Sequence, residues 1–295
     1  MANSEPCLRE VHIAPRSIDR FEGVVAPGVV AALRALALTL REQLGDHALW
    51  NFNSTAVGGG VAEMLRPLLA YTRGEGVDAR WLVISGDADF FVLTKRLHHA
   101  LHGSNGDGSP VSERERSVYE RAIARNAAEL GTFVRPGDWV VLHDPQTLGL
   151  APALRDLGAR VVWRCHIGSD TGNGEIAAAW RFLGPYLAHA EAAIFSRRAY
   201  AASAPADVPV VTIAPSLDPF SAKNQDLDEG AVRAILAHTG LVAGPAPDGA
   251  QPAFVREDGS PGRVERCADL VQLGPPAPAG AQLVVQVSRW DPLQD

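Results

Sequence analysis

The chain has 295 residues, of which 46% are hydrophobic and 21% are charged, which is enough apolar material for one large or two medium domains. Acidic residues outnumber basic ones by 34 to 27, and the formal net charge of −7 excludes a general basic surface for nucleic acid. The three cysteines, Cys7, Cys165 and Cys267, stand far apart in the sequence. They form neither a metal-ligand spacing nor a disulfide framework, which fits a reducing cytoplasm.

The amino-terminal part shows neither a targeting nor a membrane-spanning pattern. No charged region followed by an apolar core opens the chain, so we expect no signal peptide. Residues 24–40 are largely apolar, but Pro27, Gly28 and Arg34 interrupt the run. We therefore expect a packed helix there, and a cytoplasmic protein without a membrane partner.

Short apolar runs alternate with helical patterns along most of the chain. Runs of this kind are typical of strands that are covered on both faces of a parallel sheet. The pattern therefore predicts an α/β fold, a Rossmann-like parallel sheet with helices on both sides. The expected strands are residues 48–52, 80–85, 139–142, 161–165, 192–195 and 208–213. The expected helices are residues 61–73, 91–101, 112–130, 175–188 and 228–238.

Composition divides the chain near its end. Residues 243–262 are rich in Pro, Gly and Ala and are expected to form a connector. A new apolar run follows at residues 282–287, with Arg289 and Asp291-Pro292 directly after it. We therefore expect an amino-terminal domain over residues 1–280, and the first strand of a second domain over residues 281–295.

Three consecutive glycines, Gly58, Gly59 and Gly60, lie between an expected strand and an expected helix. Glycine lets the backbone approach a ligand closely, and the free N–H groups of a helix N-terminus favour an anion. The loop has neither the ending of a P-loop nor the spacing of a dinucleotide fingerprint. It predicts a phosphate or a sugar hydroxyl lying over this turn, or else a tight turn that only links the two elements.

Polar side chains end two of the expected strands. His143 and Asp144 follow one strand, and Arg164 and His166 stand at the end of the next. Parallel sheets bind ligands at the carboxyl ends of their strands. A carboxylate and an imidazole exchange hydrogen bonds with hydroxyls, and a guanidinium holds phosphate, so the set suits a sugar site. The alternative is that His143 and Asp144 cap a turn and that His166 is a satisfied buried histidine.

The expected helix at 91–101 carries a second group of polar residues. His98 and His102 are one helical turn apart, as in some metal sites, but no Glu follows the first His as in a zinc-protease helix. A surface or pocket-lining helix face is therefore favoured, and no metal is expected. Lys95 either contacts phosphate or is solvated, and its spacing does not decide between them.

Five motifs occur in an order and spacing that resemble one family. They span roughly residues 48–292, and they read Asn-Ser-Thr-x-x-Gly-Gly-Gly-Val-Ala-Glu, Phe-Phe-x-x-Thr-Lys-x-x-His, His-Asp-Pro-Gln, Trp-Arg-Cys-His-Ile and Val-Ser-Arg-Trp-Asp-Pro. Together they resemble trehalose synthase of the glycosyltransferring type. These enzymes are retaining GT-B glycosyltransferases of family 4, with trehalose phosphorylases as close relatives.

The resemblance implies a hexosyltransferase with two Rossmann-like domains, of which this chain holds the amino-terminal, acceptor-side half. Glucose would pass from a nucleoside diphosphate glucose to glucose, with retention, giving trehalose. The resemblance implies no cofactor and no metal, and a homodimer is one option for the assembly. Trehalose phosphorylase remains an alternative activity, and a non-catalytic sugar-binding module remains an alternative class.

Site residues follow from the resemblance position by position. Asp144 would hold hydroxyls of the reacting sugar, His166 would lie beside the anomeric centre, and Arg289 would neutralise the leaving diphosphate. Gln294 stands where the family has a Lys that shares this role. Because Arg289 is the only part of that apparatus present, the chain alone is expected not to transfer glucose. The implied substrate-binding residues are Ser54, Thr55, Gly58, Gly59, Gly60, Lys95, His98 and Arg164.

Overall fold

The computed structural model describes residues 6–105, 109, 111–202, 204–205, 207–256, 259–265 and 274–284. The chain forms two compact units, Met1–Ser216 and Leu217–Asp295. The domain boundary at residue 280 that the sequence suggests stays a prediction.

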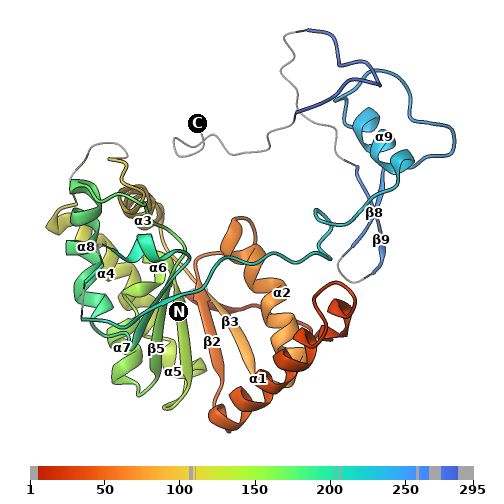
Figure 1. Cartoon of the computed structure of the whole chain (residues 1–295). Helices are drawn as coiled ribbons and strands as arrows, with labels where there is room; N and C mark the ends of the chain where they lie inside the picture. Colours follow the sequence, from red (N-terminus) through yellow and green to blue (C-terminus); the bar gives the residue numbers. More distant parts are fainter. Residues whose placement is uncertain are drawn as a thin grey trace, which may run out of the picture. The chain divides into compact units, whose positions relative to one another are not determined.

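The first unit is built on a mostly parallel sheet (Figure 1). Over the described residues this sheet has seven strands in the order β1-β3-β2-β4-β5-β6-β7. β1 pairs antiparallel with β3, and the other neighbouring pairs are parallel. The α/β class expected from the sequence is confirmed. The strands are β1 (Leu8–Glu10), β2 (Leu49–Asn53), β3 (Ala79–Ile84), β4 (Trp139–His143), β5 (Arg160–Cys165), β6 (Ala192–Phe195) and β7 (Val210–Thr212).

Helices cover both faces of this sheet. The larger hydrophobic core lies between the sheet and α3, α4, α6, α7 and α8, and the smaller core lies under α1 and α2. Successive strand residues point to opposite faces, so Leu82 joins the larger core and Trp81 the smaller one. The helices are η1 (Ile18–Phe21), α1 (Val29–Leu44), α2 (Gly60–Gly74), α3 (Ala88–Leu101), α4 (Glu113–Ala127), α5 (Leu130–Phe133), α6 (Asp144–Leu148), α7 (Ala151–Asp156), α8 (Gly174–Leu187) and η2 (Arg198–Ala201).

Short elements are where the sequence-based prediction and the structure differ. The expected strands are present as β2 to β7, with ends that differ by at most two residues. β1, α6 and α7 were not expected, because a three-residue strand and helices of fewer than two turns are too short to show a periodic pattern. Both α6 and α7 carry a proline in their first turn, where no backbone N–H is needed.

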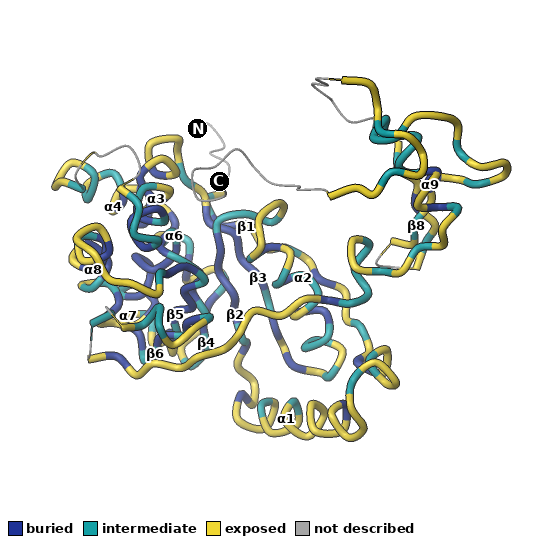
Figure 2. The backbone as a smooth tube through the Cα atoms, turned by 45° about the horizontal axis from the view of Figure 1, so that its top comes forward, coloured by how far each residue is buried: buried dark blue, intermediate teal, exposed yellow. Residues whose placement is uncertain are grey.

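The helix expected at residues 24–40 forms as α1 and packs against the smaller core through Ala37, Leu40 and Leu44. Val30 and Leu44 are its buried residues, whereas Leu33, Leu36 and Leu38 are exposed. Figure 2 shows α1 as a mostly exposed helix beside the buried strands. None of the helices in the described ranges combines the length and the apolar character that crossing a bilayer requires.

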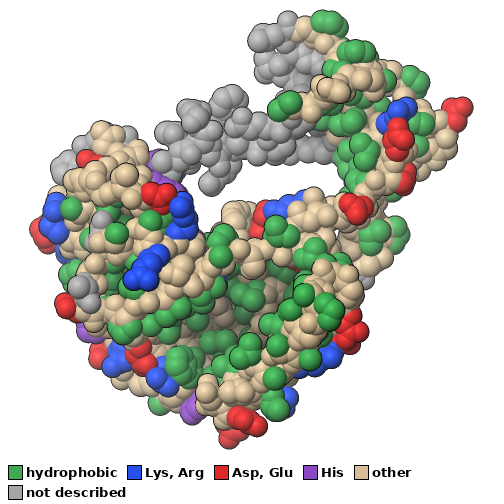
Figure 3. Space-filling model, in the orientation of Figure 1, with side chains coloured by type: hydrophobic (Ala, Val, Ile, Leu, Met, Phe, Trp, Pro, Cys, Tyr) green, Lys and Arg blue, Asp and Glu red, His purple; other side chains and the backbone are tan. Residues whose placement is uncertain are grey.

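The β7 end of the sheet is exposed on both faces. Val210, Val211 and Ile213, in and beside β7, are exposed apolar residues. Figure 3 shows hydrophobic side chains gathered over a hollowed face of this unit. The larger core lies on the other side of the sheet from α1 and α2, under α3 and α8.

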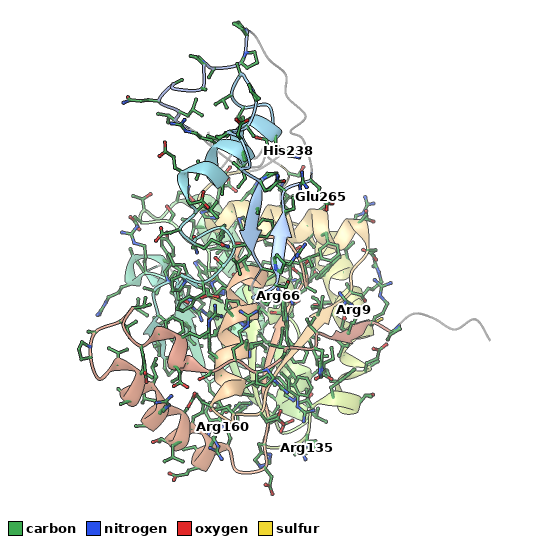
Figure 4. All side chains as sticks on the ribbon, turned by 90° about the vertical axis from the view of Figure 1, so that its right-hand side faces the viewer. Arg9, Arg66, Arg135, Arg160, His238 and Glu265 are labelled. Atoms are coloured by element: carbon green, nitrogen blue, oxygen red, sulfur yellow. The ribbon has the colours of Figure 1, made fainter. Side chains whose placement is uncertain are left out.

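The second unit contains α9 (Glu229–His238) and an antiparallel pair, β8 (Ala253–Val255) and β9 (Pro261–Arg263). The pair falls in and beside the segment expected to be a connector, so that expectation was wrong for these residues. His238 donates from Nε2 to the carbonyl oxygen of Glu265 at 3.2 Å, and Figure 4 labels both residues. Residues 282–284 of the strand expected at 282–287 are described and form no strand; residues 285–287, together with Arg289 and Gln294, lie outside the described residues.

Candidate functional site

The predicted polar residues gather at the carboxyl edge of the central strands. β4 lies between β2 and β5, with His143 in register with Arg164. Asp144 follows β4 directly, and His166 follows β5 directly. Because parallel strands end at the same edge, these side chains meet above adjacent strands.

Asp144 occupies an unusual backbone conformation. Its φ of 59° is positive, which L-residues other than glycine rarely adopt. Its Oδ1 accepts a hydrogen bond from the backbone N–H of His166 at 2.8 Å, and its carbonyl oxygen accepts one from Trp163 Nε1 at 3.0 Å. Strained residues of this kind cluster at functional sites, where the surrounding structure holds them.

Two histidines and an asparagine form a hydrogen-bonded series beside Asp144. His143 Nδ1 lies 3.0 Å from His166 Nε2, and His143 Nε2 lies 3.1 Å from Asn51 Oδ1. Asn51 and His143 are buried, and His166 is half-buried. His166 is thus tied to β4 through its ring and to Asp144 through its backbone.

Burial controls the charges of this cluster. Burial raises the pKa of Asp144 to about 7, against the opposing effects of the His166 N–H and the Arg164 charge. Burial and the nearby Arg164 lower the pKa of His166 to about 4, and burial also lowers the pKa of His143 well below its usual value. At neutral pH both imidazoles are therefore uncharged. Neutral imidazoles and a carboxyl group exchange hydrogen bonds with sugar hydroxyls without a large desolvation cost.

The glycine loop follows β2 at the same edge. Gly58 and Gly59 have positive φ values of 75° and 78°, so the turn itself requires glycine at both positions. Gly60 has no such φ, and a Cβ built on any of the three glycines meets no atom within 4 Å. Gly59 is the N-cap of α2 and provides no side-chain cap, so the first N–H groups of this helix receive no capping hydrogen bond from that residue.

The residues that precede the glycines hold the loop through local contacts. Asn53 Nδ2 donates to the carbonyl oxygen of Thr55 at 2.8 Å, and Thr55 Oγ1 donates to the carbonyl oxygen of Val57 at 2.6 Å. Ser54 lies between them and is half-buried. In Figure 4 Arg66 of α2 is labelled, and its guanidinium donates to the Ala56 carbonyl oxygen at 3.2 Å.

The residues expected from the α3 motif lie on a neighbouring helix. α3 packs against α6, which begins with Asp144, and against α8, which follows His166 in the sequence. Lys95 is exposed, His98 is half-buried, and the rings of His98 and His102 lie 4.9 Å apart between centroids. Within the described residues no group of three or more His, Cys, Asp and Glu side chains suits a metal ion.

Two residues that support the site were not predicted. Asn51 interrupts an apolar strand, and a buried polar side chain in such a run is a detectable signal. Tyr119 of α4 is fully buried; its hydroxyl donates to the Pro145 carbonyl oxygen at 2.6 Å and accepts from the Gly149 N–H at 2.8 Å. It thereby holds α6, the helix that begins with Asp144. Nothing in the sequence around Tyr119 indicates this contact.

Comparisons with known proteins agree with the expected resemblance. The family model described as trehalose synthase, N-terminal domain, matches residues 51–202. A trehalose synthase from Thermococcus litoralis is 32% identical over 219 residues, which cover 74% of this chain and 50% of that protein. A trehalose phosphorylase from Pleurotus pulmonarius is 27% identical over 226 residues, covering 72% of this chain and 30% of that protein.

A solved structure is also similar at lower identity. The trehalose-phosphate synthase (UDP-forming) from Burkholderia vietnamiensis has a TM-score of 0.44 and 17% identity, covering 64% of this chain and 51% of that chain. The chain spans about half the length of the curated trehalose synthases that it matches. The family match and the 32% identity over three quarters of its length show that this chain belongs to the trehalose synthase family, in its N-terminal domain.

Proposed function

We propose that this chain forms the acceptor-side half of a retaining GT-B glycosyltransferase that makes trehalose from a nucleoside diphosphate glucose and glucose. The observation that carries the proposal is the meeting of Asp144, Arg164 and His166 above adjacent strands, at the edge where the uncapped α2 terminus opens. Membership of the trehalose synthase family supports the substrate class.

Each group has a role in this reaction. Asp144 and His166 bind hydroxyls of the reacting sugar, while Arg164 and the α2 N-terminus favour the negative charge of the donor phosphates. The bond between the anomeric carbon and the phosphate oxygen breaks as the acceptor oxygen bonds to that carbon from the same face. The acceptor proton passes to the leaving phosphate. The protein therefore contributes mainly electrostatic stabilisation of the diphosphate, a role in which we also place Arg289.

The remaining substrate-binding roles are part of the same proposal. The exposed Lys95 and the half-buried His98 of α3, with Ser54 and Thr55 of the glycine loop, would surround the acceptor sugar. No metal or cofactor enters the reaction. We also propose a cytoplasmic location and a homodimer.

Trehalose phosphorylase is the second candidate, because three such enzymes are also similar to this chain, at 26% to 27% identity. The two activities differ in the group that carries glucose: a nucleoside diphosphate in one, inorganic phosphate in the other. Incubating the protein that contains this chain with trehalose and either phosphate or a nucleoside diphosphate, and identifying the glucosyl product, separates them.

Sugar binding by the chain itself tests the proposed site. We expect calorimetry to detect binding of glucose or trehalose, and Asp144→Asn to weaken it by up to about tenfold, because one hydrogen bond contributes about 0.5–1.5 kcal/mol. Asp78→Asn is the matched control, since Asp78 lies exposed before β3, at the opposite edge, and pairs with Arg80. Equal losses in both variants, or no binding at all, would contradict the proposal.

A further inference from the structure

His143 is the buried titratable group that the proposed reaction leaves unused. It is the last residue of β4, its side chain is 2% exposed, and both of its ring nitrogens face a partner. One partner is His166, which faces the sugar site, and the other is Asn51 of β2. A buried histidine between a site residue and an amide oxygen is suited to orient the site residue.

The two imidazole rings lie edge to edge. Their planes are 10° apart, their centroids are 5.3 Å apart and the facing nitrogens are 3.0 Å apart. The centroids are farther apart than the facing nitrogens by about twice the distance from a ring centre to its own nitrogen. Both nitrogens therefore lie on the line that joins the centroids, and the two rings are nearly coplanar. A hydrogen bond between imidazoles runs along an in-plane lone pair, and this arrangement provides it.

We propose that Asn51 and His143 are positioning residues that fix the tautomer of His166. Asn51 Oδ1 accepts only, so His143 carries its proton on Nε2 and donates it to Asn51. His143 Nδ1 is then an acceptor, and His166 carries its proton on Nε2. The Nδ1 of His166 is left with a free lone pair.

The direction of the hydrogen bonds from His166 through His143 to Asn51 defines what the site recognises. Each neutral imidazole carries one N–H, so the acceptor oxygen of Asn51 fixes the tautomer of both rings. The lone pair on His166 Nδ1 accepts a hydrogen bond from a sugar hydroxyl and does not donate one. This inference rests on the proposed function, because the ligand that supplies the hydroxyl is the sugar of that site.

Nitrogen-15 NMR of residues 1–295 tests the tautomers without any ligand. We expect long-range spectra at neutral pH to show His143 and His166 both protonated on Nε2 and not on Nδ1. Finding His166 protonated on Nδ1, or on both nitrogens, would overturn the inference. Because no sugar is present, this result is independent of whether the proposed function holds.

Variants on one face of β2 separate positioning from packing. Asn51→Leu removes the acceptor, and we expect the preference of His166 for the Nε2–H tautomer to fall about tenfold. Asn51→Asp keeps an acceptor oxygen and restores the preference. Asn53→Leu is the matched control, because Asn53 is equally buried two residues along and its Oδ1 accepts from the Trp81 indole N–H rather than from an imidazole. Loss of the preference in Asn53→Leu as well would contradict the role of Asn51; the wild-type spectrum remains decisive if a variant does not fold.

Sugar analogues test the lone pair. At one hydroxyl of glucose, the deoxy and the deoxyfluoro analogues should both bind about tenfold more weakly, because fluorine accepts but does not donate. Saturating glucose should move the Nδ1 resonance of His166 upfield. Binding of glucose without that movement of the Nδ1 resonance would overturn the inference. Absence of glucose binding would overturn the proposed function, and the ligand-free spectrum would then decide the tautomers.

Discussion

The half-buried Asp144 combines a left-handed backbone conformation with a carboxyl group whose pKa is raised by burial. Both features are unfavourable in isolation, and both are held by contacts from β5: the His166 N–H on Oδ1 and the Trp163 indole on the carbonyl oxygen. Asparagine tolerates a positive φ as well as aspartate does, so Asp144→Asn changes the charge while keeping the backbone.

The pH dependence of stability should carry the signature of this carboxyl group. Its pKa of about 7 in the folded protein exceeds the ordinary value of 3.8, so the folded state binds the proton more tightly. Its contribution is therefore fully present below about pH 4 and is lost as the pH rises through about 7.

The lowered pKa of His166 acts in the opposite direction between about pH 4 and 6.5, so the wild-type curve alone is ambiguous. We expect the free energy of unfolding of wild type minus that of Asp144→Asn, from urea titrations, to fall between pH 4 and 7. A difference that rises over this range would show that the carboxyl group is stabilised as the anion.

Substitutions at Gly59 and Gly60 distinguish a glycine loop that contacts a ligand from one that is a turn only. Gly59→Ala is strained by its φ of 78°, and we expect a loss of about 1–2 kcal/mol of stability. Gly60→Ala has an ordinary φ and open space for its Cβ, so stability should be unchanged or slightly increased. If a ligand lies against the loop, calorimetry should show weaker binding in Gly60→Ala; unchanged affinity would make the loop a turn only.

At the scale of elements, α6 depends on a residue from another helix. The Tyr119 hydroxyl bridges the Pro145 carbonyl oxygen and the Gly149 N–H, while its ring stacks on Phe90 with centroids 5.7 Å apart. Tyr119→Phe keeps the ring packing and leaves a buried carbonyl and a buried N–H without this partner. We expect a loss of about 2 kcal/mol in urea unfolding, with weaker sugar binding because Asp144 opens this helix.

Tyr186→Phe provides the comparison for this effect. Tyr186 is also a tyrosine of the helical layer, and its hydroxyl bonds with Arg116 and Glu120 rather than with α6. Its loss should cost less than about 1 kcal/mol, since those partners remain accessible to water. Similar sugar affinities in the two variants would show that α6 does not need Tyr119 to place Asp144.

The elements also show which features of the structure the sequence patterns predict and which they do not. β2 to β5 were predicted because parallel strands buried on both faces read as apolar runs. Asp144 and His166 were predicted to converge because each follows such a strand. The links among them were not predictable, since Asn51, Tyr119 and the coplanar histidines are paired by side-chain geometry between residues far apart in the sequence.

On the scale of the whole molecule, the chain divides at residue 216. Both hydrophobic cores lie within the first unit, and so do the residues gathered at the carboxyl edge. The sequence did not indicate this division, because the exposed segment after β7 has no marked change in composition. The β8–β9 pair was missed because three-residue strands inside a Pro- and Gly-rich stretch carry no periodic signal.

Residues 1–216 should therefore fold and bind sugar without the second unit. A core enclosed within one unit supplies its own apolar burial, so the shorter chain should unfold in a single cooperative urea transition. Because Asp144, Arg164, His166 and the glycine loop are all retained, the affinity for glucose should stay within about threefold of that of residues 1–295. A broad, non-cooperative transition would mean that the second unit completes the fold. Cooperative unfolding with lost affinity would instead place part of the sugar site after residue 216. The Asp144→Asn variant of residues 1–295 would then show how much the carboxyl edge of the sheet contributes to the sugar affinity.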